Sequence, residues 1–154
     1  MTQPRWVFVT PTLRRPTGGD IALFELVSAL ARREAGGVHL VHVPFRGART
    51  RRLADLPWAA LHPAVEHTFA ERLDPDDLPA GDVLVYTMKL IASAHGPDAA
   101  PGGAPLLAAL ADPDRWGSPP VLFLQGLGVF GDEVEALALR LPGIKACVST
   151  WLTR

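Results

Sequence analysis

The sequence is poor in cysteine and has no long hydrophobic run. A single cysteine, Cys147, stands among its 154 residues, which excludes a disulfide within the chain. Its apolar stretches, such as residues 121–124, fall far short of the roughly 20 residues that a membrane-spanning helix needs. The first residues lack the apolar core and cleavage site of a secretory signal. We therefore expect a cytoplasmic protein in which Cys147 acts as a small buried hydrophobe.

The sequence also lacks the signals of three kinds of ligand site. The five histidines are not joined to cysteines or carboxylates at the spacing of metal ligands, so no metal site is expected. The arginines are not interleaved with aromatic residues, as they are on a nucleic-acid-binding surface. The glycines do not follow the dinucleotide fingerprint Gly-x-Gly-x-x-Gly, which disfavours a nicotinamide cofactor. We expect no metal, no cofactor and no nucleic-acid partner.

Charge is distributed unevenly, although the whole chain carries a net charge of only −1. Residues 1–52 hold nine arginines and three acidic residues, whereas the remainder is acidic with a net charge of −7. Four of these arginines fall in one loop-like stretch: Arg46, Arg49, Arg51 and Arg52. Such a stretch suits an anionic membrane surface, a phosphate or an acidic glycan, or it is a solvated loop. The first alternative places the protein at the inner face of the membrane.

What is present is the pattern of one soluble α/β domain. The 48% apolar and 20% charged residues are close to the averages for globular proteins. Short apolar runs predict six strands, at 5–10, 38–43, 64–70, 82–87, 121–125 and 144–149. Helical segments are predicted between them, at 19–34, 88–94, 104–111 and 132–141. This alternation predicts a Rossmann-like, doubly wound, mostly parallel sheet of about six strands with helices on both faces.

The end of the sequence predicts an incomplete element. Ser149 is suited to cap a helix whose opening turn is 151–154. A helix of so few residues does not form alone. We therefore expect the natural protein to continue past Arg154.

Two groups of residues resemble a known family. The first group resembles the opening of GT-B glycosyltransferases, especially the retaining family called glycosyltransferase group 1, or family 4-like. It consists of residues 8–13, Thr17-Gly18-Gly19, residues 24–27 and residues 29–33. The second group resembles the last elements of the same domain. It consists of residues 120–128, the helix predicted at 132–141, which begins with acidic residues, and residues 148–152. The glycine after the double arginine is delayed to Gly36-Gly37, and residues 45–115 match only in the order of elements.

The resemblance implies a role and a domain arrangement. Residues 1–154 would be the N-terminal, acceptor-side domain of a hexosyltransferase-like enzyme, with the C-terminal donor domain absent from this chain. The partners would be a nucleotide-sugar donor, a glycan or small hydroxyl acceptor, and that second domain. The chain alone would be inactive. Two alternatives stay open: a non-catalytic module that binds a phosphorylated ligand or a protein, and half of a nucleotide-sugar epimerase.

The same resemblance nominates site residues at the carboxyl ends of the strands. Gly18 and Gly19 would let a helix N-terminus approach the donor diphosphate. An acceptor cleft would be lined by Thr12, Thr87, Lys89, Gln125 and Gly126.

The catalytic base is not assigned. Many relatives carry a histidine at the strand end where this chain has Gln125, and a glutamine bonds a hydroxyl but does not take its proton. His95, beside a glycine in a loop, is a second candidate for a catalytic role, and Asp132 and Glu133 either act as the base of an inverting enzyme or stabilise the start of their helix. Retaining and inverting chemistry both stay open.

Overall fold

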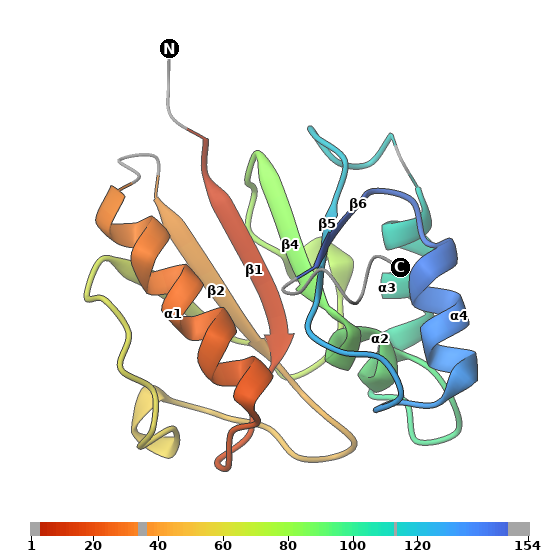
Figure 1. Cartoon of the computed structure of the whole chain (residues 1–154), viewed down its shortest axis with the longest axis horizontal. Coiled ribbons are helices and arrows are strands. Elements are labelled where there is room, and N and C mark those ends of the chain that lie inside the picture. The colour runs from red at the N-terminus through yellow and green to blue at the C-terminus, as the bar shows by residue number, and fades with distance from the viewer. Residues whose placement is uncertain (1–3, 34–36, 113, 148–154) are drawn as a thin grey trace.

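A six-stranded sheet forms the centre of the protein, in a computed structural model that describes residues 4–33, 37–112 and 114–147. The strand order is β3-β2-β1-β4-β5-β6, and every neighbouring pair is parallel. The strands are β1 (Trp6–Pro11), β2 (Val38–Val43), β3 (Val65–Phe69), β4 (Val83–Thr87), β5 (Val121–Leu124) and β6 (Ile144–Cys147). Figure 1 shows the order, and the predicted doubly wound α/β fold is confirmed.

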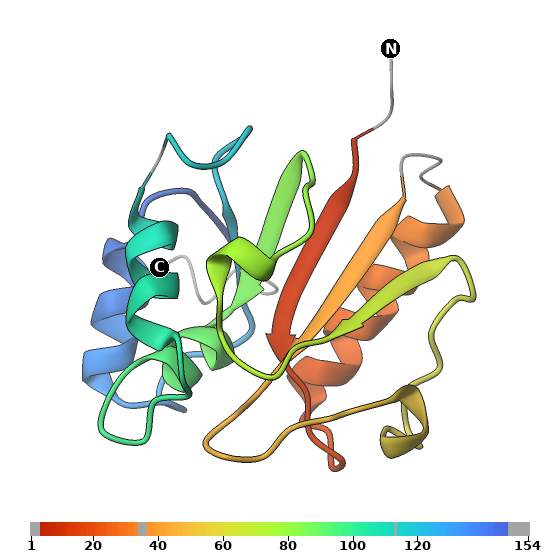
Figure 2. The same ribbon diagram turned by 180° about the vertical axis from the view of Figure 1, so that it is seen from behind.

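Helices cover both faces of this sheet. Helix α1 (Gly18–Arg33) lies on one face, and α2 (Met88–Ala94), α3 (Gly103–Ala111) and α4 (Asp132–Arg140) lie on the other (Figures 1 and 2). Two short 3-10 helices, η1 (Leu53–Asp55) and η2 (Pro75–Asp77), lie in stretches where the sequence indicates only loops. None of the described helices is both long and apolar enough to cross a bilayer.

The central strands β1, β2 and β4 are buried on both faces, whereas the edge strands β3 and β6 are mostly only partly buried. Residues 7–11 and all of β2 are buried. On one face Phe8 and Leu40 pack beneath the stripe of α1 that contains Leu23 and Val27. Full burial of each such side chain contributes about 1.5–3 kcal/mol, so this stripe fixes the position of α1 on the sheet.

The first turn of α1 is closed by a capping box. The amide and hydroxyl of Thr17 both donate to the carboxylate of Asp20, at 2.8 and 3.0 Å, and the Asp20 amide donates to the Thr17 hydroxyl oxygen at 3.4 Å. Beyond the other end of the helix, Gly37 has a φ of +93°, the left-handed conformation that glycine tolerates best.

Most predicted element bounds are within one residue of those observed. The β2 and α2 predictions match residue for residue, and α1 begins at Gly18 rather than at residue 19. Cys147 differs from expectation because it is only partly buried at the sheet edge. The predicted Ser149 cap and the turn at 151–154 lie outside the described residues.

Candidate functional site

The strand order reverses between β1 and β4, and doubly wound sheets hold ligands beyond the carboxyl ends of the strands at such a point. The hydroxyls of Thr10 on β1 and Thr87 on β4 are 3.1 Å apart and buried. This contact joins β1 and β4 at the point where the chain leaves the two strands toward opposite faces of the sheet. The Thr87 oxygen also accepts a 3.4 Å bond from the Leu90 amide and caps α2. These bonds hold the ends of the two strands together.

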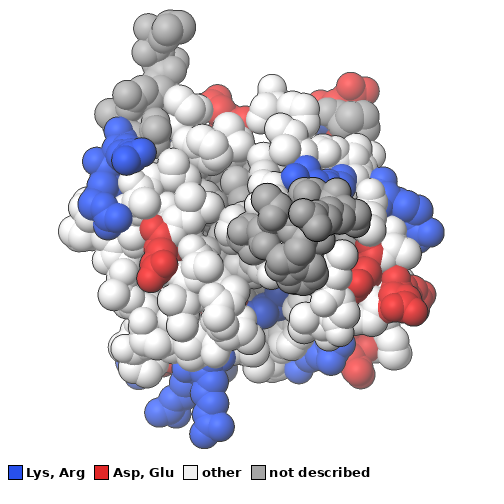
Figure 3. Space-filling model, in the orientation of Figure 1, with Lys and Arg blue, Asp and Glu red and all other residues white. Residues whose placement is uncertain are grey.

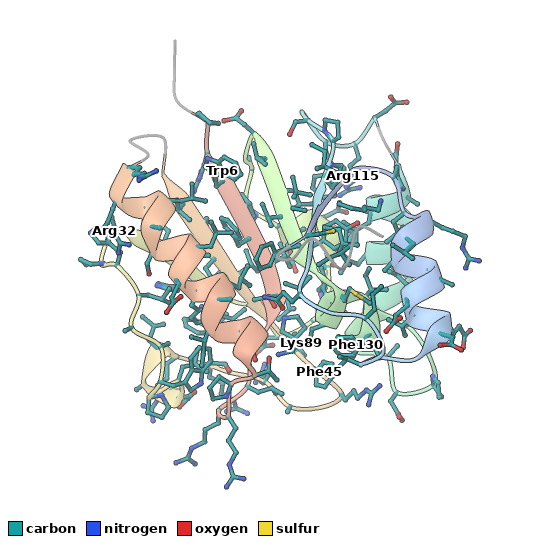
Figure 4. The ribbon with its side chains drawn as sticks, viewed as in Figure 1. Trp6, Arg32, Phe45, Lys89, Arg115 and Phe130 are labelled. Carbon is teal, nitrogen blue, oxygen red and sulfur yellow. The ribbon has the colours of Figure 1, made fainter. Side chains whose placement is uncertain are left out.

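A cavity of about 300 Å³ lies beyond these strand ends. Phe45, Lys89 and Phe130 gather at the edge where the strands end, as Figure 4 shows, and all three line the cavity. The polar part of the lining is Thr17, Gly19, Lys89, Gln125 and Gly126. The apolar part is Leu13, Phe45, Met88, Phe123, Val129 and Phe130. A mostly apolar hollow with a few converging polar groups is the usual form of a small-molecule site.

Lys89, on the cavity wall, belongs to a buried ion pair. The Lys89 ammonium lies 2.5 Å from a carboxylate oxygen of Asp20, with exposed side-chain fractions of 10% and 4%. Lys89 comes from the start of α2 and Asp20 from the first turn of α1, on opposite faces of the sheet. Because Asp20 is also held by Thr17, the ammonium has a fixed position at the cavity wall.

Gln125 reaches the same wall from the end of β5. Its side-chain amide donates to the carbonyl of Gly19. A Cβ on residue 19 would lie 2.4 Å from the Gln125 side-chain oxygen and 2.8 Å from its Cδ, which is too close. Gly19 is therefore required for this contact between α1 and β5, a role separate from the predicted approach to phosphate.

We expect Gly19→Ala to displace the Gln125 side chain with little loss of stability, because only the end of a flexible side chain has to move. Gly18→Ala is the matched control, since a Cβ there meets nothing within 4 Å. The side-chain amide signal of Gln125 in a ¹H–¹⁵N spectrum should shift in the first variant and stay in place in the second. Equal shifts in both variants would contradict this geometry.

The aromatic wall includes a residue held by a tight turn. The backbone groups of Phe45 and Ala48 bond to each other at 2.8 and 2.9 Å. The two residues between them, Arg46 and Gly47, have φ values of +45° and +81°, as a two-residue turn of this kind requires. The Arg46 guanidinium lies 5.3 Å from the centre of the Phe45 ring. This turn presents Phe45 to the cavity.

The structure brings together only some of the predicted site residues. Gly19, Lys89, Gln125 and Gly126 line the cavity, whereas Gly18 begins α1 beside it. Thr12 and Thr87 are buried, and their hydroxyls bond to protein groups. Neither threonine is on the wall of this cavity, although Thr12 lines a neighbouring cleft.

His95 lies elsewhere, after the last residue of α2. Its imidazole is 3.1 Å from the exposed carboxylate of Glu133 on α4, and it does not line the cavity. A role for His95 as catalytic base therefore has no geometric support.

The hydroxyl of Thr12 belongs to a buried histidine cluster. It is 3.1 Å from Nδ1 of His42, whose Nε2 is 3.0 Å from Nδ1 of His67. The rings of His42 and Phe69 are stacked with centroids 4.4 Å apart. Burial lowers the pKa of His42 to about 3 and lowers that of His67, with neighbouring histidine charge as a smaller cause. These imidazoles are neutral at pH 7 and anchor the loop that leaves β1.

Among the described residues no three His, Cys, Asp or Glu side chains lie close enough together to hold a metal ion. Asp20 and the aromatic wall belong to the site but were not predicted from the sequence. The spacing Thr17-x-x-Asp20 is a helix-start signal. The pairing of Asp20 with Lys89 has no signal of its own, because the two residues are 69 positions apart.

No protein-family model matches the sequence, and no curated protein matches it. The solved structures that resemble it include UGT2 of Phytolacca americana, a UDP-glycosyltransferase, complexed with UDP-2fluoro-glucose and pterostilbene. The TM-score is 0.47 at 18% identity, over 82% of this chain and 31% of that one. Apo UGT2 gives the same score and identity over 80% and 29%. This chain thus spans under a third of the length of these neighbours. The assignment of its fold is based on its own strand order.

Proposed function

We propose that this chain is the acceptor-side half of a GT-B glycosyltransferase, which moves a sugar from a nucleotide-diphosphate donor to a hydroxyl acceptor. The observation that carries the proposal is the cavity at the point where the strand order reverses. Its wall combines a fixed ammonium, a side-chain amide and aromatic rings. The resemblance of residues 8–33 to the opening of GT-B enzymes is consistent with this assignment.

The proposed roles follow from the chemistry of each group. The Lys89 ammonium stabilises negative charge that develops on the leaving diphosphate, because it is largely buried and already oriented by Asp20. The Gln125 amide bonds a hydroxyl of the acceptor or of the sugar. The amides of Gly18 and Gly19, at the start of α1, face the donor phosphates in this proposal.

None of the polar groups on the cavity wall is an obvious base. Lys89 is paired as an ammonium, and an amide does not take a proton from a hydroxyl. In a retaining transfer the leaving phosphate itself assists the acceptor. We therefore propose that the proton is accepted by the departing diphosphate or by a group of the donor domain, with no metal or cofactor held by this chain.

The proposal divides the substrates between two domains. This chain shapes the acceptor side, and a second α/β domain outside it grips the nucleotide. This chain alone is then inactive.

Calorimetric titration of UDP-, GDP- and dTDP-sugars into this chain and into the intact gene product tests the division. We expect tight binding only to the intact product, with the preferred nucleotide identifying the donor. Tight binding to this chain alone would contradict the proposal and favour a stand-alone module for a phosphorylated ligand.

A further inference from the structure

A second cleft lies at the same edge of the sheet, and the function proposed above does not use it. It has a volume of about 580 Å³ and is formed by the loops that follow β1 and β2. Three arginines line it, Arg14 from the first loop and Arg49 and Arg52 from the second. Asp55 is the one acidic residue on its wall. Figure 3 shows basic side chains projecting from the lower edge of the molecule, where the strands end.

The predicted cluster of four arginines is therefore divided. Arg49 and Arg52 belong to this cleft, whereas Arg46 packs over Phe45 beside the first cavity. Arg51 lines a smaller hollow on the far side of Arg49. Arg14, which lies outside the predicted cluster, completes the cleft from the other loop.

The backbone of the cleft is fixed by bonds between the two loops. The Thr50 hydroxyl donates to the Thr12 carbonyl at 2.9 Å, and the indole of Trp58 donates to the Leu13 carbonyl at 3.1 Å. The Thr12 hydroxyl is in turn held by His42. The arginines are thus mounted on loops that are tied to the sheet and to each other.

The charge of the cleft exceeds what the protein itself neutralises. Arg52 is 3.3 Å from Asp55, and Arg49 is 2.8 Å from Glu71, whose side chain is 80% exposed. The Arg49 hydrogen bond holds the pKa of Glu71 below its usual value, so Glu71 is ionised at neutral pH. Arg14 has no ion pair within the part of the chain that the structure describes. Two of the three guanidinium groups are thus offset by Asp55 and Glu71, which leaves one net positive charge at the cleft, on Arg14.

We propose that this cleft binds a phosphate monoester carried by the acceptor. Such a group has a charge of about −1.5 to −2 at pH 7 and three acceptor oxygens, which match the charge and the donors of the arginines. Leu13 lines both this cleft and the first cavity, so one ligand reaches from the arginines to Lys89 and Gln125. The identification of the ligand as an acceptor rests on the proposed function, but anion binding by the cleft does not.

Glycerol phosphate, with glycerol as the uncharged control, is titrated into this chain in a phosphate-free buffer. We expect glycerol phosphate to bind and glycerol not to bind. Arg14→Gln and Arg49→Gln should each weaken binding about tenfold. Glu71→Gln should strengthen binding several-fold, because it removes the exposed carboxylate that competes for Arg49. Arg32→Gln, near the opposite edge in Figure 4, should change nothing.

Sedimentation with phosphatidylcholine vesicles, with and without phosphatidylglycerol, separates a lipid headgroup from a free phosphate ester. Arginine-dependent binding to the anionic vesicles without binding of glycerol phosphate would overturn the proposal in favour of a membrane contact. Equal weakening by Arg14→Gln and Arg32→Gln would overturn it as non-specific charge attraction. Because no sugar transfer is measured, a failure of the transferase assignment leaves this result unaffected.

Discussion

Replacing Lys89 with methionine is expected to lower the free energy of unfolding by about 3 kcal/mol. The substitution leaves the Asp20 carboxylate, only 4% exposed, without its ammonium partner. Removing one member of a buried pair costs about 3–5 kcal/mol. Asp20 keeps its two bonds from Thr17, which places the loss at the lower end of that range. Urea denaturation of the two proteins measures the difference.

The double variant K89M/D20N provides the control. Asparagine retains an oxygen for the helix cap but removes the buried charge. The double variant should therefore be more stable than the sum of the single changes predicts, and the double-mutant cycle gives the coupling. A loss below about 1 kcal/mol in K89M, or strict additivity in the cycle, would show that the pair is not buried as described.

Stability is also expected to fall steeply as the pH is lowered from about 6.5 to 3. His42 in the unfolded chain takes up a proton near 6.5, whereas burial lowers its pKa in the folded protein to about 3. The unfolded state therefore binds more protons in this window, so acid favours it by about 1.4 kcal/mol per pH unit from this residue. His39 and His67, whose pKa values burial also lowers, add in the same direction.

His42→Gln tests this assignment. Glutamine keeps a donor and an acceptor for Thr12 and His67 but does not titrate. Urea midpoints and m-values collected between pH 7 and pH 4.5 should show a shallower pH dependence in the variant, by about 1.4 kcal/mol per pH unit. This slope is independent of any uniform loss of stability that the substitution causes. An unchanged slope would assign the acid sensitivity to other groups.

The sequence predicts most of the fold because the signals are local. Strand β4 is apolar at every position before Thr87, which is the pattern of a parallel strand covered on both faces, and α1 has a continuous apolar stripe. Such patterns do not depend on distant residues. The short helices η1 and η2 escaped prediction because 3-10 turns of three residues carry little periodicity.

The site is less predictable because its contacts join distant positions. That Lys89 and Gln125 lie at strand ends follows from the parallel sheet, and both line the cavity. That Thr12 and Thr87 turn inward depends on His42 and Thr10, which are partners that no local pattern reveals. The hydrogen bond from Gln125 to Gly19 connects residues that are 106 positions apart in the sequence. A pair of glycines in the sequence indicates that another group packs closely against the backbone there, but it does not identify that group.

The measurement that tests the central claim most directly is the sugar-transfer rate of the intact gene product. The rate is followed as release of nucleoside diphosphate from the donor that calorimetry identifies. K89M should lower kcat/KM by about 100-fold or more, since it removes the positive charge at the cavity. Phe130→Ala, on the aromatic wall, should raise the acceptor KM with little change in kcat, and R32Q should match the wild type. Undiminished transfer by folded K89M and F130A proteins would contradict the account, because the reaction would then take place away from this cavity.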